Sequence, residues 1–206
     1  MHRGLRRHGC TRGPFIALAL LAATFLSGCV ETAIDDEIVF RPDGSGSARV
    51  TIAMAKDGLA LVGSPEQITE KIRNDLPPGT TLQTRQNQKW AYWDITFSFR
   101  NPRDLQDKMN VIVGSIVGSK DKPEGFTYLS FTRTGGLFQA SYRYSAEVKI
   151  AFEGDAAVLA PYFRGWTHRV VLPGRIVESN GTHAGERAQW SIPAGRPLRV
   201  TATSSA

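Results

Sequence analysis

The sequence has very little cysteine. Cys10 and Cys29 are the only two in 206 residues, and Cys10 lies in an N-terminal segment with the pattern of a cleaved signal peptide. Without that segment one cysteine remains, so no disulfide can form within the chain. The fold therefore has to be stable without a disulfide, and a hydrophobic share of 41% is enough for an ordinary core.

The sequence also lacks a run of apolar residues long enough to cross a membrane. Residues 1–13 carry four arginines and no acidic residue, and residues 15–26 are almost wholly apolar. Basic, then apolar, then small residues is the order typical of a signal peptide. The alternative, an uncleaved membrane helix, needs about 20 apolar residues, and this apolar core is shorter. We therefore predict a signal peptide over residues 1–28.

The apolar core ends at Leu26-Ser27-Gly28-Cys29, which resembles a bacterial lipobox. The resemblance implies cleavage between Gly28 and Cys29, and attachment of a diacylglycerol and further acyl groups such as palmitate to Cys29. Two or three acyl chains hold a protein on a membrane effectively permanently. We expect a lipid-anchored, extracytoplasmic protein of the bacterial cell envelope. Because Val30 rather than Asp follows the cysteine, we expect the outer membrane in a Gram-negative cell, and otherwise the outer leaflet of the cell membrane.

A strong basic excess is missing too. The whole chain has 25 basic and 19 acidic residues, but four of the arginines belong to the predicted signal peptide. The mature chain is therefore close to neutral. This balance does not favour a nucleic-acid partner.

Signs of catalysis or metal binding are scarce. There is no Gly-x-Ser-x-Gly elbow, and neither His168 nor His183 has the spaced partners of a zinc site. We expect no catalytic residue, no metal and no cofactor, and hence no enzyme. Two alternatives stay open: a hydrolase, if either histidine lies in a pocket near a serine and an acid, and a cation site at the acidic run 35–37, which we otherwise interpret as solvated surface.

Alternating apolar and polar residues predict most of the chain to be strand. Helices are predicted to begin at Ser64-Pro65 and Asn101-Pro102, where a capping residue precedes a proline. The predicted strands lie at 38–40, 48–54, 80–86, 90–99, 126–133, 137–153, 166–172, 175–179, 187–192 and 197–203. We expect an α+β fold with a mainly antiparallel sheet, two helices and a turn-rich C-terminal β region. It would form one domain over residues 38–203, after a lipidated tether at 29–37.

Two regions together carry a family resemblance. The segment 93–99, WDITFSF, precedes Asp104-Leu105, and the segment 172–181, LPGRIVESNG, is followed by 190–193, WSIP. With the lipobox they resemble the LppM-like bacterial lipoproteins over most of residues 29–203. The resemblance implies an α+β extracytoplasmic domain that recognises envelope lipid. Many members carry a C-terminal membrane helix as well; this sequence shows none, so we expect the lipid to be the anchor.

Aromatic residues give the one further indication of function. In the strand 90–99, Trp90 and Tyr92 fall on the face opposite Trp93 and Phe97. If that face is open, both rings could line a ligand groove or touch the bilayer surface, where amphipathic rings are favoured. The alternative, which the sequence favours, is that both faces are covered. We expect a non-enzymatic binding domain for an envelope lipid or hydrophobic ligand; alternatively, a structural subunit of a cell-envelope assembly.

Overall fold

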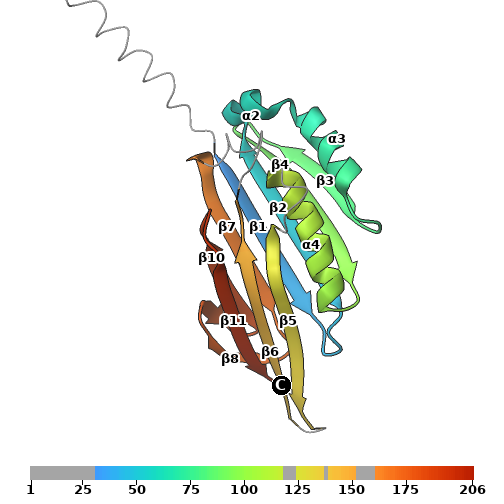
Figure 1. Cartoon of the computed structure of the whole chain (residues 1–206), viewed down its shortest axis with the longest axis vertical. Helices are drawn as coiled ribbons and strands as arrows, with labels where there is room; N and C mark the ends of the chain where they lie inside the picture. Colours follow the sequence, from blue (N-terminus) through green and yellow to red (C-terminus); the bar gives the residue numbers. More distant parts are fainter. Residues whose placement is uncertain (1–30, 118–123, 137–138, 152–160) are drawn as a thin grey trace, which may run out of the picture.

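Two β-sheets and the helices that pack beside them form the domain (Figure 1). The computed structural model describes residues 31–117, 124–136, 139–151 and 161–206. In sheet order, the large sheet consists of β3 (Thr81–Gln86), β4 (Trp90–Phe99), β2 (Gly46–Ala55), β1 (Thr32–Phe40), β7 (Phe163–Val171), β10 (Arg187–Ile192) and β9 (Thr182–Ala184). The small sheet consists of β5 (Gly125–Gly135), β6 (Ala140–Lys149), β11 (Leu198–Ser205) and β8 (Arg175–Ser179).

The small sheet and two helices lie on the same side of the large sheet (Figure 1). These helices are α3 (Pro65–Asp75) and α4 (Pro102–Val117), while the short α2 (Lys56–Val62) follows directly after β2. Aromatic rings bridge the two layers: Phe40 stacks on Phe131 with centroids 4.4 Å apart, and Phe126 meets Trp166 edge-on. The core is therefore one layer between two sheets, with helices filling the part that the small sheet does not reach.

The expected α+β class with two helices is wrong, because the described residues are mostly β, with eleven strands in two sheets and three helices. The turn-rich C-terminal region is divided between the two sheets: it contributes β7, β9 and β10 to the large sheet and β8 and β11 to the small one. Pairing across more than 120 residues of sequence, as between β1 and β7, leaves no local signal. The β1–β7 pair is parallel, whereas the other strand pairs of the described chain are antiparallel.

The first strand begins earlier than expected. Residues up to 37 were predicted to be a tether, but β1 begins at Thr32, and both Thr32 and Asp36 are fully buried. The interpretation of 35–37 as solvated surface is therefore wrong for Asp36. Three consecutive acids hide the alternating pattern of a strand. Asp36 faces the core, whereas Asp35 and Glu37 face away from it.

Both helix starts are as the capping residues predict. Ser64 and Gln67 form a reciprocal capping box at α3, in which each side chain bonds the other residue's backbone N–H. At α4 the Asn101 side chain accepts from the Asp104 backbone N–H, and the Asp104 carboxylate accepts from the Arg100 N–H. These bonds satisfy backbone donors that a helix leaves free at its start.

A hydrogen-bonded chain of buried side chains connects the two layers. Asp36 of β1 accepts from the ring nitrogen Nδ1 of His168 at 2.9 Å and from the indole N–H of Trp166. On the other side of the imidazole, Nε2 lies 2.9 Å from the hydroxyl of Tyr144 in the small sheet. Burial raises the pKa of Tyr144 well above its usual value of about 10, and the Asp36 charge raises it further. The hydroxyl thus stays protonated and is hydrogen-bonded to Nε2.

We expect the substitution Tyr144→Phe to lower the free energy of unfolding by about 1–3 kcal/mol, because it leaves the His168 Nε2 buried without a partner. Urea unfolding followed by circular dichroism measures the difference. The matched control is Tyr142→Phe. Tyr142 lies two residues earlier on the same buried face, and its ring stacks on Phe131. Its hydroxyl takes no part in the hydrogen bonds that join Asp36, His168 and Tyr144. The control should change stability by less than about 0.5 kcal/mol; equal losses would contradict a special role for Tyr144.

Candidate functional site

The large sheet presents one face to solvent, and two of the predicted site residues are on it. Trp90 and Tyr92 lie on β4 with their side chains partly exposed, on the face opposite the buried Trp93. The expectation that both faces are covered is therefore wrong. The other predicted site residues, Gly28 and Cys29, lie outside the described residues.

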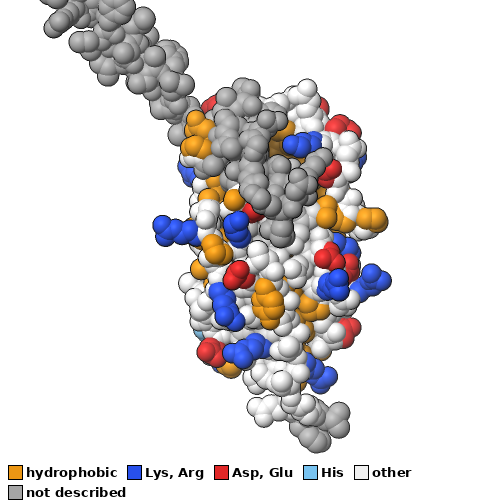
Figure 2. Space-filling view, in the orientation of Figure 1, with side chains coloured by type: hydrophobic (Ala, Val, Ile, Leu, Met, Phe, Trp, Pro, Cys, Tyr) orange, Lys and Arg blue, Asp and Glu red, His pale blue; other side chains and the backbone are white. Residues whose placement is uncertain are grey.

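We call this surface the open face. It arises because each strand alternates between core-facing and solvent-facing residues, and the register brings the solvent-facing ones side by side. Its charged members are Asp35, Glu37, Arg49, Arg85, Asp94, Arg169 and Arg187. The opposite side of the molecule, formed by the small sheet and the helices, shows charges of both signs interspersed with scattered apolar side chains (Figure 2).

Two arginines on the open face share one carboxylate. The Asp94 Oδ1 accepts from the Arg49 guanidinium at 3.0 Å, and Oδ2 accepts from the Arg85 Nε at 2.8 Å. The Thr51 hydroxyl donates to Oδ1 at 2.6 Å. The Asp94 side chain is only 8% exposed, whereas those of Arg49 and Arg85 are 60% and 54% exposed. We call Arg49 and Arg85, held in this way, the arginine pair.

The charge of Asp94 is well stabilised. Burial raises its pKa, but hydrogen bonds from Thr51, Arg85 and Arg49 outweigh burial, so that the pKa of Asp94 lies below its usual value. Asp94 is therefore ionised at neutral pH and orients both guanidinium groups. With two cations to one anion the cluster keeps a positive excess, and each guanidinium has N–H donors that Asp94 does not use.

Aromatic rings lie next to the arginine pair. The guanidinium carbon of Arg85 is 3.9 Å from the ring centroid of Tyr92, a cation–π contact, and the Trp90 ring is 6.4 Å from that of Tyr92. The open face thus offers a cationic surface that continues into an amphipathic aromatic one.

The remaining charges of the open face are matched one to one. Arg187 pairs with Glu37 at 2.7 Å, and Arg169 binds both Asp35 and the side chain of Gln189. These pairs leave no positive excess, which distinguishes them from the arginine pair. They are the type of polar surface that either water or a protein partner can cover.

A groove adjoins the arginine pair at the edge of the large sheet. It has a volume of about 250 Å³ and lies between α3 and the β3–β4 hairpin. Its walls include Glu70 and Arg73 of α3. They also include Arg85, which belongs to the arginine pair, and Tyr92, whose ring lies against Arg85. Thr69 lies in its wall and accepts from the Trp93 indole N–H at 2.9 Å, which ties the helix to the sheet.

The described residues give no support to the hydrolase alternative: the surface pocket that His183 lines contains Glu186 but no serine. His168 is fully buried and bonded to Asp36 and Tyr144, and His183 is exposed on β9. In the described part of the chain, no three His, Cys, Asp or Glu side chains are grouped so that they could hold a metal ion. Likewise, none of the described helices is long and apolar enough to span a membrane. That the protein is not an enzyme stays a prediction.

Sequence reasoning missed the arginine pair. Asp94 stands between Trp93 and Ile95 and is the only charged residue of β4, and such a lone acid is a signal that a partner is needed. Its partners are on β2 and β3, and only the register of three strands identifies them.

The family model of the LppM domain matches residues 36–206, so the chain belongs to the LppM domain family. The resemblance drawn from residues 93–99 and 172–181 is thereby confirmed. Among solved structures, the NMR structure of the folded domain of LppM from Mycobacterium tuberculosis is similar at 14% identity and a TM-score of 0.49, covering 85% of this chain and 90% of that one. No curated protein matches the chain.

We expect Asp94→Asn to lower the free energy of unfolding at pH 7 by about 1–3 kcal/mol, because two guanidinium groups lose their charged acceptor. The folded-state pKa of Asp94 is lowered. The charge therefore stabilises the fold at pH values above about 4, the pKa of an unfolded aspartate, and this contribution disappears as the pH falls through the folded-state pKa. Urea unfolding at pH 7 and pH 3 measures both effects.

Asp35→Asn is the matched control. Asp35 lies on the same face and also pairs with an arginine, Arg169, but its side chain is 45% exposed. Exposed ion pairs contribute about 0–1 kcal/mol, so the control should change stability less than Asp94→Asn. The difference in free energy of unfolding between Asp94→Asn and the native protein should be smaller at pH 3 than at pH 7. An equal difference at both pH values would contradict this account.

Proposed function

We propose that the protein is a lipid-anchored, extracytoplasmic lipoprotein whose domain binds an anionic group of an envelope lipid, without catalysing a reaction. Membership of the LppM domain family supports the lipoprotein assignment, and the lipobox at residues 26–29 supports the anchor. The observation that carries the proposal is the arginine pair on the open face, with its unused N–H donors and positive excess.

The chemistry of guanidinium groups fits a phosphate-type ligand. A guanidinium presents planar N–H donors that match phosphate or carboxylate oxygens two at a time, and charge-assisted bonds of this kind are about twice as strong as neutral ones. Asp94 holds Arg49 and Arg85 from below. Because the guanidinium groups are oriented in advance, a ligand does not have to order two long side chains.

The aromatic residues fit the apolar part of the same ligand. Tyr92 and Trp90 lie beside the arginine pair on one face, so a lipid whose headgroup binds Arg49 and Arg85 can place glycerol or acyl carbons on the rings. The matched charge pairs of Asp35 and Glu37 favour a second candidate, an envelope protein seated on the open face as part of an assembly.

The anchor is tested by the substitution Cys29→Ser. We expect the native protein to incorporate an alkyne-labelled fatty acid and to lose its signal peptide, because the thiol is the site of acylation. The Cys29→Ser protein should remain an unlabelled precursor. In-gel fluorescence and the mass of the intact protein measure both, and a labelled Cys29→Ser protein would contradict the assignment.

The ligand site is tested with residues 30–206 and vesicles of phosphatidylglycerol or phosphatidylcholine. We expect binding to phosphatidylglycerol, and a loss of about tenfold for Arg49→Gln, because one charge-assisted contact accounts for about 1.4 kcal/mol or more. Vesicle flotation over a range of lipid concentrations gives the affinities.

Arg143→Gln is the control for this experiment. Arg143 is exposed on β6, in the small sheet and away from the open face. Its substitution removes the same charge from the protein and should leave binding unchanged. An equal effect of both substitutions would indicate general electrostatic attraction rather than the arginine pair. Absence of vesicle binding together with a co-purifying envelope protein would favour the second candidate.

A further inference from the structure

The distance between the predicted lipid and the folded domain is very short. β1 begins at Thr32, three residues after Cys29. An extended chain spans at most about 3.6 Å per residue, so the Cα atom of Thr32 lies within about 11 Å of that of Cys29. If Cys29 carries the lipid, as proposed above, the end of the domain that contains Thr32 is held at the bilayer surface.

The register shows which residues share this end. The Ala55 backbone N–H donates to the Glu31 carbonyl at 2.8 Å, and Ala55 is opposite Trp90 in the β2–β4 pair. The next residue, Lys56, donates its N–H to the Lys89 carbonyl at 2.9 Å. We call this the anchor end, and define it by Glu31, Thr32, Ala55, Lys56, Lys89 and Trp90. In Figure 1 the start of β1, the start of β7 and α2 lie together there.

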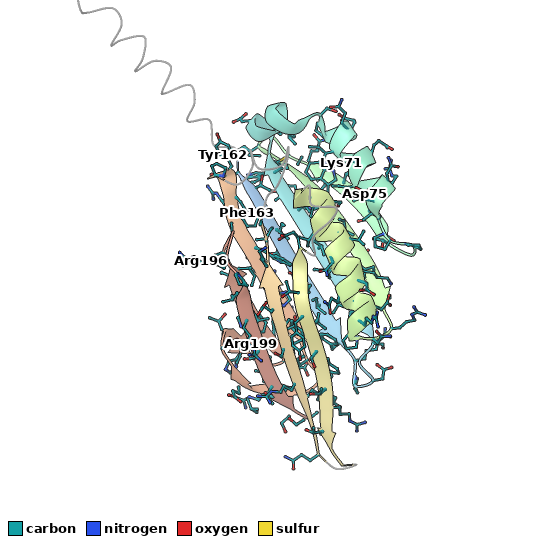
Figure 3. All side chains as sticks on the ribbon, in the orientation of Figure 1. Lys71, Asp75, Tyr162, Phe163, Arg196 and Arg199 are labelled. Carbon is teal, nitrogen blue, oxygen red and sulfur yellow. The ribbon has the colours of Figure 1, made fainter. Side chains whose placement is uncertain are left out.

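Side chains at the anchor end are of the type that bilayer surfaces favour. Figure 3 shows Tyr162 and Phe163 at the start of β7, at the same end, and Thr32 is opposite Phe163 in the β1–β7 pair. Lys89 is exposed and Lys56 is partly exposed. The Glu31 carboxylate is paired with Arg164, so it does not repel an anionic lipid surface as a free acid would.

Trp90 differs from the other tryptophans of the chain. Trp93, Trp166 and Trp190 are 1%, 1% and 5% exposed, whereas Trp90 is partly exposed. From β1, Trp90 is two strands away in the sheet, which is about 10 Å. Its ring therefore lies within reach of the headgroup region, where the amphipathic indole is favoured.

We propose that the anchor end faces the bilayer and that Trp90 contacts the lipid–water interface, so that the strands of the large sheet lead away from the membrane. This inference rests on the proposed lipid anchor at Cys29, and it does not depend on the arginine pair. The occupant is a lipid surface because the tether between Cys29 and Thr32 is too short to leave room for a protein layer between the bilayer and the anchor end.

The test uses the lipidated mature protein, purified from membranes and reconstituted into vesicles of phosphatidylcholine alone. One sample contains phosphatidylcholine brominated on the acyl chain, which quenches nearby tryptophan. We expect the protein to float with the vesicles and brominated lipid to lower its emission by up to the share that one tryptophan of four contributes. The Trp90→Phe protein should float equally and lose this quenching.

A second variant, with Trp90→Phe and Val177→Trp, provides the control for position. Val177 is 61% exposed on β8, near the opposite end of the domain where the chain ends (Figure 1), and the new tryptophan should not be quenched by brominated lipid. Quenching of this variant as strong as that of the native protein would overturn the proposal.

Flotation separates the failure of this inference from that of the proposed function. A native protein that floats but is not quenched overturns the orientation and leaves the anchor intact. A native protein that does not float overturns the anchor, and the orientation with it.

Discussion

The buried hydrogen bonds from Asp36 through His168 to Tyr144 are the constraint on which the rest of the structure depends. A carboxylate and an imidazole in a core cost several kcal/mol unless each is bonded. Asp36 is opposite His168 in the β1–β7 pair, and Tyr144 comes from the other sheet. A slip of β1 by one residue would turn Asp36 to solvent and leave His168 without its acceptor. These buried hydrogen bonds therefore fix both the register of the large sheet and the position of the small sheet over it.

The same register determines what the open face carries. Since Asp36 and His168 point into the core, their neighbours Asp35 and Arg169 must point outward and meet each other. The small sheet has four strands and the large sheet has seven. The small sheet therefore covers only part of the inner face of the large sheet, and α3 and α4 cover part of the remainder. No described element covers the open face, so its arginines and carboxylates neutralise one another across strands. The exception is Asp94, which serves two arginines.

Local features of the sequence could be predicted because their causes are local. The capping box of Ser64 and Gln67 and the alternation along β4 and β6 each lie within one element. The partner of β1 could not be predicted, because β7 begins 131 positions after the start of β1 and the sequence of neither strand indicates that the two pair. For the same reason Asp36 was interpreted as surface, and no partner could be named for His168. The aromatic residues Trp90 and Tyr92 could be found from alternation alone, whereas Arg49 and Arg85 required the register.

Strand β4 connects the two proposed sites of the molecule. Its first residue, Trp90, belongs to the anchor end, and Asp94, which holds the arginine pair, follows four positions later on the same face. A strand rises about 3.3 Å per residue, so about 13 Å separate these two residues along the sheet. The polar region on each side of a bilayer is about 5–8 Å deep. With the anchor end at the interface, a domain standing upright holds the arginine pair just above the headgroups. A tilt toward the open face brings Arg49 and Arg85 down to the phosphates while Tyr92 stays between them and Trp90. If Cys29 carries the lipid, as proposed, the short tether does more than retain the protein: it keeps the arginine pair close enough for a tilt of the domain to bring it to the anionic headgroups.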